Sequence, residues 1–297
     1  MNAGAGTGHG ADMRAQLTEK FAAQGVEAAV TLALDGEEMI AAARQALARG
    51  VDAVVAGGGD GTINAVASVL AGSGVPFGVL PLGTLNHFAK DLNIPLELDQ
   101  AIATIVRGVP AAVDVGEVNG RIFLNNSSLG MYPHIVRDRD QQQRRLGRGK
   151  WTAFGWAVVA ALRRFPFLGV RLKINGDEHA RRTPFVFIGN NAYQMEGFHI
   201  GVRERLDGGA LSIYVAQRPT RFGLLRLALR ALLGRLAQAR DFDVLSCADF
   251  VIETRHARLH VATDGEVTVM RAPLCYRSRP AALSVLVPLA AVEQGGA

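Results

Sequence analysis

The sequence has 297 residues, of which 49% are hydrophobic, and a formal net charge of +5 at neutral pH. This length fits one large domain or two ordinary ones, and the apolar half is enough for a sizeable core. The two cysteines, Cys247 and Cys275, exclude a disulfide framework, and we expect both to be buried thiols in a reducing cytosol. Residues 1–20 lack a signal-peptide pattern, and no segment of about 18 residues is free of charge. These features predict a cytoplasmic protein without a membrane span.

Residues 1–108 alternate between helical and strand-like patterns. Helices are predicted near 11–23, 36–49, 62–71, 85–91 and 97–107, and strands near 26–32, 51–56 and 76–80. Such alternation is typical of the α/β class, in which helices connect the strands of a parallel sheet and cover both of its faces. We therefore expect an N-terminal three-layer domain at 1–108.

From residue 109 onwards, short strand-like runs replace this alternation. Turn dipeptides at Asn119-Gly120 and Asn175-Gly176 separate such runs. Further strands are predicted at 170–174, 184–189, 211–215, 249–254, 258–262 and 267–270. Closely spaced strands predict a largely antiparallel β-sandwich domain at 109–297, with two long helical stretches inserted. A return of the extreme C-terminus to the first domain is the alternative for the last residues.

Residues 56–64, with the sequence Ala-Gly-Gly-Gly-Asp-Gly-Thr-Ile-Asn, form a glycine-rich turn between a predicted buried strand and a helix. Such a turn points backbone N–H groups and the positive helix end at an anion, and its glycines admit a phosphate that a Cβ would block. Asp60 in its middle requires a Mg²⁺ ion or several donors beside it. The pattern is neither a P-loop nor a dinucleotide fingerprint, and a purely structural turn is the alternative. We interpret it as a nucleotide phosphate site.

A second polar loop follows the next predicted strand. Residues 81–89 read Pro-Leu-Gly-Thr-Leu-Asn-His-Phe-Ala and lead into another helical segment. The carboxyl ends of neighbouring parallel strands form the crevice in which α/β folds bind ligands. Thr84 and Asn86 are therefore candidates to hydrogen-bond a phosphate or a ribose.

Two acids near the C-terminus, Asp264 and Glu266, flank Gly265. In a strand they would share one face, and in a turn both could converge on one site. A carboxylate so placed is suited to accept a proton. The alternative is an ordinary hairpin turn, because Asp-Gly is a favoured turn dipeptide.

Together, these three motifs resemble those of the diacylglycerol-kinase-type lipid kinases. Gly58-Gly59-Asp60-Gly61-Thr62, Pro81-Leu82-Gly83-Thr84-Leu85-Asn86 and Asp264-Gly265-Glu266 match in order and spacing, closest to the soluble bacterial members related to sphingosine kinases. The resemblance covers nearly the whole chain, whereas the first element alone is shared with NAD kinases. It implies two lobes with ATP between them, Mg²⁺, and a lipid hydroxyl as phosphoryl acceptor.

The same resemblance implies roles for single residues. Glu266 would be the proton acceptor, Asp264 its acidic catalytic partner, and Asp60 would complete a network of Mg²⁺ and water. The implied nucleotide-binding residues are Gly58, Gly59, Asp60, Gly61, Thr62, Asn64, Gly83, Thr84 and Asn86, together with Asn2 in an N-terminal phosphate loop.

Three features depart from the family pattern. Relatives begin with an apolar strand before an Asn-Pro-x-x-Gly-like loop, whereas this sequence starts at that loop; we expect a start codon set too far downstream, and a truly absent first strand is the alternative. His87 stands where many relatives carry Asp, and we expect no catalytic role for it. Gly208 lacks the carboxylate of a structural Mg²⁺ site in the second lobe, which leaves Asp207 as the candidate ligand.

Two basic segments predict peripheral contact with an anionic membrane surface. Residues 221–240 carry an arginine at every fourth or fifth position along one helical face, with leucines on the rest. Residues 137–150 are basic and lead into both tryptophans of the chain, which suit a headgroup boundary. Core-packed helices with a solvated edge are the alternative. We do not expect nucleic-acid binding, because no recognition motif accompanies the basic residues.

The leading hypothesis is an ATP-dependent lipid kinase of phospholipid metabolism that works at the inner face of the membrane. A soluble NAD kinase is the alternative enzyme, and a non-catalytic nucleotide- or lipid-binding relative is the alternative of a different class. The sequence does not identify the acceptor lipid or the oligomeric state.

Overall fold

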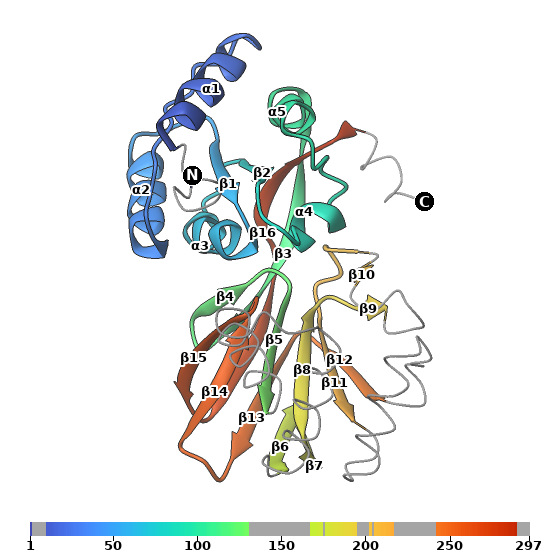
Figure 1. Cartoon of the computed structure of the whole chain (residues 1–297). Coiled ribbons are helices and arrows are strands. Elements are labelled where there is room, and N and C mark those ends of the chain that lie inside the picture. The colour runs from blue at the N-terminus through green and yellow to red at the C-terminus, as the bar shows by residue number, and fades with distance from the viewer. Residues whose placement is uncertain are drawn as a thin grey trace, which may run out of the picture. The chain divides into compact units, whose positions relative to one another are not determined.

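The computed structural model describes residues 1, 10–130, 167–174, 176–194, 202–203, 205–216 and 242–289. The chain forms two compact units (Figure 1). The first unit comprises Met1–Val115, Arg205–Asp207 and Arg279–Ala297, and the second comprises Gly116–Glu204 and Gly208–Ser278. The chain enters the second unit within strand β3 (Val109–Val118) and leaves it within β16 (Leu274–Val287). Within the described ranges, no helix is long and apolar enough to cross a membrane.

The first unit has the predicted α/β arrangement. Its helices are α1 (Gly10–Ala22), α2 (Gly36–Ala48), α3 (Asp60–Leu70), α4 (His87–Asp91) and α5 (Leu98–Arg107), and its own strands are β1 (Val54–Gly58) and β2 (Phe77–Pro81). β1 lies parallel to β2, and β2 pairs in parallel with the last part of β16. Every residue of β2 is buried, as expected for a central parallel strand. Helix α3 packs against β1, and α5 packs against β2.

The strand predicted near 26–32 is not formed. The amino group of Met1 donates to the Thr31 carbonyl at 2.9 Å, and the Ala33 N–H donates to the Met1 carbonyl at 2.9 Å. These two bonds join the end of the segment to Met1, but residues 26–32 are not in a strand, and most of the segment is exposed. High β-propensity therefore misled the prediction, because propensity reports packing on a sheet surface that this segment does not share.

The second unit is the predicted antiparallel sandwich. One sheet has the order β12-β11-β8-β5-β14-β15, and the other joins the first part of β16 to β13, β6 and β7. The strands are β4 (Arg121–Phe123), β5 (Asn126–Gly130), β6 (Leu168–Ile174), β7 (Asp177–Thr183), β8 (Phe185–Asn190), β9 (Tyr193–Gln194), β10 (Val202–Arg203), β11 (Leu211–Ala216), β12 (Phe242–Cys247), β13 (Asp249–Thr254), β14 (Arg258–Thr263) and β15 (Glu266–Arg271). Both sheets contribute to one core: Leu172 and Ile252 come from one, and Ile188, Ile213 and Val261 from the other. All five are fully buried, which stabilises the fold by about 1.5–3 kcal/mol per side chain.

The two cysteines differ in their surroundings. Cys247 is buried, and burial raises the pKa of its thiol to about 11, so the thiol is protonated and unreactive at neutral pH. Cys275 is exposed, so the prediction that both thiols are buried is wrong for this residue. Successive residues of β16 alternate between buried and exposed in this part of the strand, and Cys275 falls on the outer face. The predicted basic helical segments at 137–156 and 221–240 lie outside the described residues.

The predicted hairpin at Asn119-Gly120 connects β3 and β4. Both residues have positive φ angles, 47° for Asn119 and 84° for Gly120, as a two-residue hairpin turn requires. The Asn119 side chain also ties the turn to the end of β15 and the start of β16. Its Oδ1 accepts from the Cys275 N–H at 2.8 Å, and its Nδ2 donates to the carbonyls of Arg271 and Pro273 at 3.0 and 3.3 Å.

We predict that Asn119→Ala lowers the free energy of unfolding by about 1–3 kcal/mol, because it removes these bonds and strains a left-handed backbone. Asn119→Gly keeps the backbone conformation at little cost and should lie between the wild type and the Ala variant. Chemical denaturation of the three proteins measures the order. Equal stability of the Ala variant and the wild type would contradict this account of the turn.

Candidate functional site

The first glycine loop joins β1 to α3. Gly59 precedes the helix with an extended backbone, and no side chain caps the helix start. The first-turn N–H groups of α3 therefore present the positive end of the helix to the loop. Gly58 is required by packing, since a Cβ there would lie 2.6 Å from the Thr62 side chain. The predicted ligands Thr62 and Asn64 follow in α3, and both are half-buried.

The second loop, between β2 and α4, is held by Asn86. This buried residue has a left-handed backbone, with φ of 50°. Its Oδ1 accepts from the Gly83 N–H at 3.0 Å, and its Nδ2 donates to the Gly83 carbonyl at 2.8 Å and the Pro81 carbonyl at 3.3 Å. The Asn86 side chain thus stabilises the conformation of its own loop. Thr84, by contrast, is exposed at the tip of the loop.

The two loops touch backbone to backbone. The Leu82 N–H donates to the Gly58 carbonyl at 3.0 Å, and a Cβ on Gly83 would lie 2.4 Å from the Gly59 Cα. Asp60 links them again, because its carboxylate accepts from the Phe88 N–H at 3.2 Å. The structure therefore unites the predicted residues of both loops in one site of the first unit.

Gly61 differs from the glycines that touch the neighbouring loop. It lies in the first turn of α3 with an ordinary helical backbone, and none of the described residues has an atom within 4 Å of the position of a Cβ. Packing therefore does not require a glycine at this position. Space of this kind beside a helix N-terminus is what a bound phosphate needs.

The Asp264-Gly265 pair forms the hairpin turn between β14 and β15, with Thr263 opposite Glu266. Both turn residues have positive φ angles, 48° and 85°. The Asp264 carboxylate does not point into open solvent. It accepts from the backbone N–H groups of Leu124, Asn125 and Asn126 at 2.7, 2.8 and 3.0 Å.

Glu266 has the opposite environment. Its side chain is 70% exposed, and its carboxylate pairs with the Arg121 guanidinium at 2.6 Å. The Arg121 Nε also donates to the Thr263 hydroxyl at 3.0 Å, so the arginine is anchored to the same turn. The two acids of the motif therefore do not share one set of contacts: Asp264 holds backbone, and Glu266 faces outward.

The charge state of Asp264 depends on opposing effects. Burial raises the pKa of its carboxyl, while the three donated N–H bonds and the nearby Arg203 lower it. Arg121, Arg203 and Asn125, which build this region, were not predicted from the sequence. They lie about 60 to 140 residues from Asp264 along the chain, and no local motif marks them.

The residues around Asp207 do not fit a structural metal site. The Asp207 carboxylate pairs with the Arg205 guanidinium at 3.0 Å. In the second unit, the Asn191 Oδ1 accepts from the Gly208 N–H at 2.9 Å and lies 2.6 Å from where a Gly208 Cβ would be. An amide oxygen thus fills the space of the side chain that Gly208 lacks. Among the described residues, no three acidic, His or Cys side chains come together as a metal site.

Asp60 fits a different kind of metal site, in which Mg²⁺ is bound together with a nucleotide. Mg²⁺ in nucleotide sites is held by one or two carboxylates and by the phosphates of the substrate, so a single acid beside a phosphate loop is sufficient. Asn2, the remaining predicted ligand, lies outside the described residues. His87 is the exposed first residue of α4.

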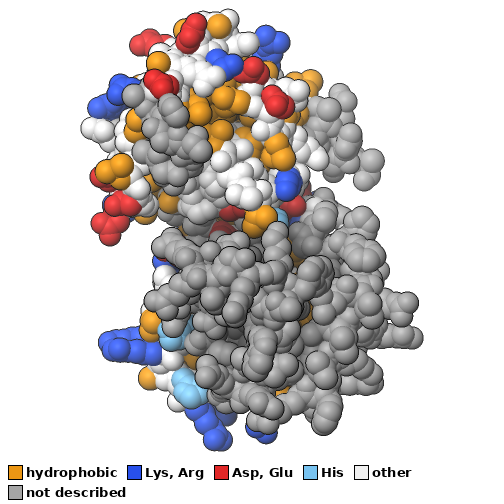
Figure 2. All heavy atoms as spheres, viewed as in Figure 1, with side chains coloured by type: hydrophobic (Ala, Val, Ile, Leu, Met, Phe, Trp, Pro, Cys, Tyr) orange, Lys and Arg blue, Asp and Glu red, His pale blue; other side chains and the backbone are white. Residues whose placement is uncertain are grey.

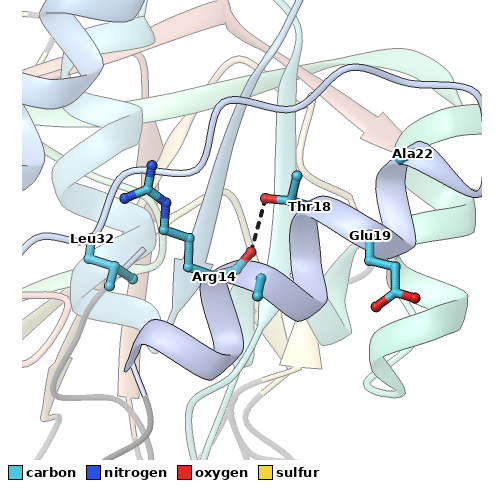
Figure 3. A pocket seen from close by; sticks show the side chains of 6 residues that line it. Arg14, Thr18, Glu19, Ala22 and Leu32 are labelled. Carbon is cyan, nitrogen blue, oxygen red and sulfur yellow. Dashed lines mark hydrogen bonds between the residues drawn. The ribbon is translucent and has the colours of Figure 1, made fainter.

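A shallow hollow of about 550 Å³ lies elsewhere in the first unit, beside α1 (Figure 3). It is lined by Arg14, Ala15, Thr18, Glu19, Ala22 and Leu32. The Thr18 hydroxyl donates to the Arg14 carbonyl within the helix. None of the predicted site residues lines this hollow, and its polar groups do not converge on one point. On the face of the first unit seen in Figure 2, acidic and basic side chains are interspersed rather than gathered by sign.

An α/β unit that ends in two contacting glycine loops, together with an antiparallel sandwich that carries an acidic turn, defines the class of two-unit α/β kinases. Sequence comparison agrees with this class. The diacylglycerol kinase catalytic domain matches residues 1–118, and the YegS C-terminal NAD kinase beta sandwich-like domain matches residues 132–287. The chain belongs to the diacylglycerol kinase family of lipid kinases.

Individual relatives lead to the same family. The chain is 30% identical to the Probable lipid kinase YegS-like of Pseudomonas syringae, over 96% of this chain and 92% of that one. It is 37% identical to the diacylglycerol kinase of Bacillus subtilis over 127 residues, which are 42% of either chain. The crystal structure of a diacylglycerol kinase from Bacillus anthracis matches in fold, with a TM-score of 0.71 at 19% identity, over 98% of this chain and 96% of that one.

The two glycines Gly83 and Gly61 give a matched test of the site. Gly83→Ala should lower the free energy of unfolding by about 1–3 kcal/mol, because the new Cβ overlaps the Gly59 backbone.

Gly61→Ala should keep or raise stability, by up to about 1 kcal/mol, since Ala is the better helix former and its Cβ meets no atom of the described residues. The same Gly61 variant should bind ATP more weakly, because its methyl group fills the phosphate space. Thermal unfolding and ATP titration measure both; a Gly61→Ala protein with unchanged ATP affinity contradicts the phosphate assignment.

Proposed function

We propose that this protein is an ATP-dependent lipid kinase that transfers the γ-phosphoryl group of ATP to the hydroxyl of a membrane lipid such as diacylglycerol. The observation that carries the proposal is the pair of contacting glycine loops with open space at Gly61. Phosphoryl transfer needs positioning of the phosphates and neutralisation of their charge more than covalent participation by the protein. A helix N-terminus, close backbone N–H groups and one carboxylate supply these needs.

In this proposal the loop residues bind the nucleotide. Backbone N–H groups from Gly59 to Thr62 hold phosphate oxygens, and the exposed Thr84 hydroxyl donates from the second loop. Asp60 would hold the Mg²⁺ that accompanies ATP, while its bond to Phe88 keeps the two loops in register. When bound, the Mg²⁺ would neutralise charge on the phosphates.

The proposed proton acceptor is Glu266. A lipid alcohol has a high pKa and gains from a carboxylate that accepts its proton during transfer, an effect of about 10²–10⁴-fold in rate. Glu266 is exposed and can reach a substrate, whereas the Asp264 carboxylate is already used by three backbone N–H groups. We therefore assign proton acceptance to Glu266 and support of the turn to Asp264.

The acceptor is proposed to be a lipid at an anionic membrane surface. The names of the relatives specify diacylglycerol or a lipid without further detail. The basic segments of the sequence at 137–150 and 221–240 suit a peripheral contact with the inner face of the membrane. A soluble acceptor such as NAD is distinguished by a lipid-free assay, in which this proposal expects no phosphorylated NAD.

Replacement of the proton acceptor tests the proposal. Glu266→Gln keeps the size of the side chain but cannot accept the proton, so we expect lipid phosphorylation to fall by about 10²-fold or more. ATP binding, measured by titration calorimetry, should be unchanged.

Glu178→Gln is the matched control, because Glu178 is also an exposed, ion-paired glutamate of the second unit. That control should keep the wild-type rate. Unchanged turnover in the Glu266 variant would remove this residue from the proton-accepting role.

Membrane contact has its own test. Replacing Arg226, Arg230 and Arg235 together by Glu should weaken binding to anionic liposomes in a sedimentation assay, because each basic residue near such a surface contributes about 1 kcal/mol. A variant with Arg255, Arg258 and Arg271 replaced by Glu carries the same change in net charge. Equal binding by the two variants would contradict a specific role for the 221–240 segment.

A further inference from the structure

Arg203, on the short strand β10, is a buried cation whose side chain no catalytic assignment above uses. The residue is only 4% exposed. Burying a guanidinium is costly unless it is hydrogen-bonded and its charge is balanced. A specific reason for its position is therefore expected.

The guanidinium is directed at one short backbone segment. Nη1 donates to the Leu124 carbonyl at 2.7 Å and to the Asn190 carbonyl at 3.2 Å, and Nη2 donates to the Asn125 Oδ1 at 2.7 Å. The group also lies over the Tyr193 ring, 5.4 Å from its centre. These partners are all neutral groups.

Asp264 holds the same segment by its other polar groups. The Asp264 carboxylate accepts the N–H groups of residues 124–126, whereas Arg203 takes the carbonyl of Leu124 and the side chain of Asn125. Burial raises the pKa of the Asp264 carboxyl, and the three N–H donors and the nearby guanidinium oppose this rise. Asp264 and Arg203 thus clamp the Leu124–Asn126 segment between them.

Glu266 is connected to this clamp through the Asp264-Gly265 turn. It lies two residues after Asp264, across a turn whose first residue is anchored by the three N–H bonds. If Asp264 no longer accepts these N–H bonds, the turn and Glu266 can shift. A displacement of about 1 Å of a catalytic group can cost about 10²-fold in rate.

We propose that Arg203 is a positioning residue: with Asp264 it clamps the Leu124–Asn126 segment and so fixes the turn that presents Glu266. The inference rests on the proposed function, because it assigns Arg203 a place in lipid phosphorylation. A residue that merely stabilised the fold would lower the apparent kcat only through the fraction of folded protein, so kcat is compared per folded enzyme. A positioning residue for Glu266 affects the transfer step.

The kinetic test compares Arg203→Met, Arg203→Lys and Arg271→Met. Met keeps the length of the side chain without charge or donors, and Lys keeps the charge without the planar fork. Arg271 is the matched control, since it lies on the same strand as Glu266 but is exposed. For folded Arg203→Met we expect kcat to fall about 10- to 100-fold, with the KM for ATP changed by less than about twofold. Arg203→Lys should recover part of kcat. A folded Arg203→Met protein with the kcat of the Arg271 control overturns the proposal.

A stability cycle keeps the inference testable without catalysis. Arg203→Met and Asp264→Asn each remove bonds to the Leu124–Asn126 segment, so each change alone should lower the melting temperature. The double variant should lose less than the sum of the two single losses. Additive losses overturn the clamp. If the wild type transfers no phosphate to lipid, the proposed function fails, while the cycle still decides whether the clamp exists.

Discussion

The close approach of two glycine loops is the constraint on which the candidate site depends. Gly83 lies so near Gly59 that a single Cβ would come within 2.4 Å of backbone. This contact is possible because β1 and β2 are parallel neighbours with matched ends, Gly58 opposite Pro81. The loops at their carboxyl ends are thereby brought together, and Asp60 and Asn86 hold them with side-chain bonds to backbone. At the start of helix α3, the N-cap Gly59 has no side chain, and no atom of the described residues lies within 4 Å of a Cβ at Gly61.

In the acidic turn of the second unit, the two carboxylates of one motif have different surroundings. Asp264 accepts from three backbone N–H groups of the segment that the buried Arg203 also binds, whereas Glu266 stays exposed with an ion pair to Arg121. The positive φ angles at Asp264 and Gly265 explain the spacing, because a two-residue turn places the acids in different environments. A motif that looks like a catalytic pair in sequence can thus contain one acid for chemistry and one for shape.

Much of the architecture could be predicted from hydrophobic periodicity. The α/β class, the antiparallel sandwich and the hairpin at Asn119-Gly120 followed from local patterns. Strand β1 extends two residues further than predicted, because Gly57 and Gly58 pair with β2 despite their low β-propensity. Strand β16 was missed because Arg277, Arg279 and Pro280 interrupt its apolar pattern. It changes partners along its length, from β13 to β2, and this long-range pairing leaves no local trace.

The site was predictable to a similar degree and for the same reason. Glycine loops and the acidic turn are local motifs, so their residues could be named from the sequence. Arg203, Arg121 and Asn191 could not, because each acts on residues distant in the chain. That Asp207 serves a metal ion stays a prediction. A local motif suggested it, whereas the ion pair with Arg205 and the Asn191 amide at Gly208 left no signal in the sequence.

The most direct test of the central claim is transfer of labelled γ-phosphate from Mg-ATP to a bacterial lipid extract in detergent micelles, with the products separated by chromatography. The account predicts one labelled lipid, whose mobility identifies the acceptor. A folded protein that binds ATP and labels no lipid would contradict the claim that this chain is a working lipid kinase.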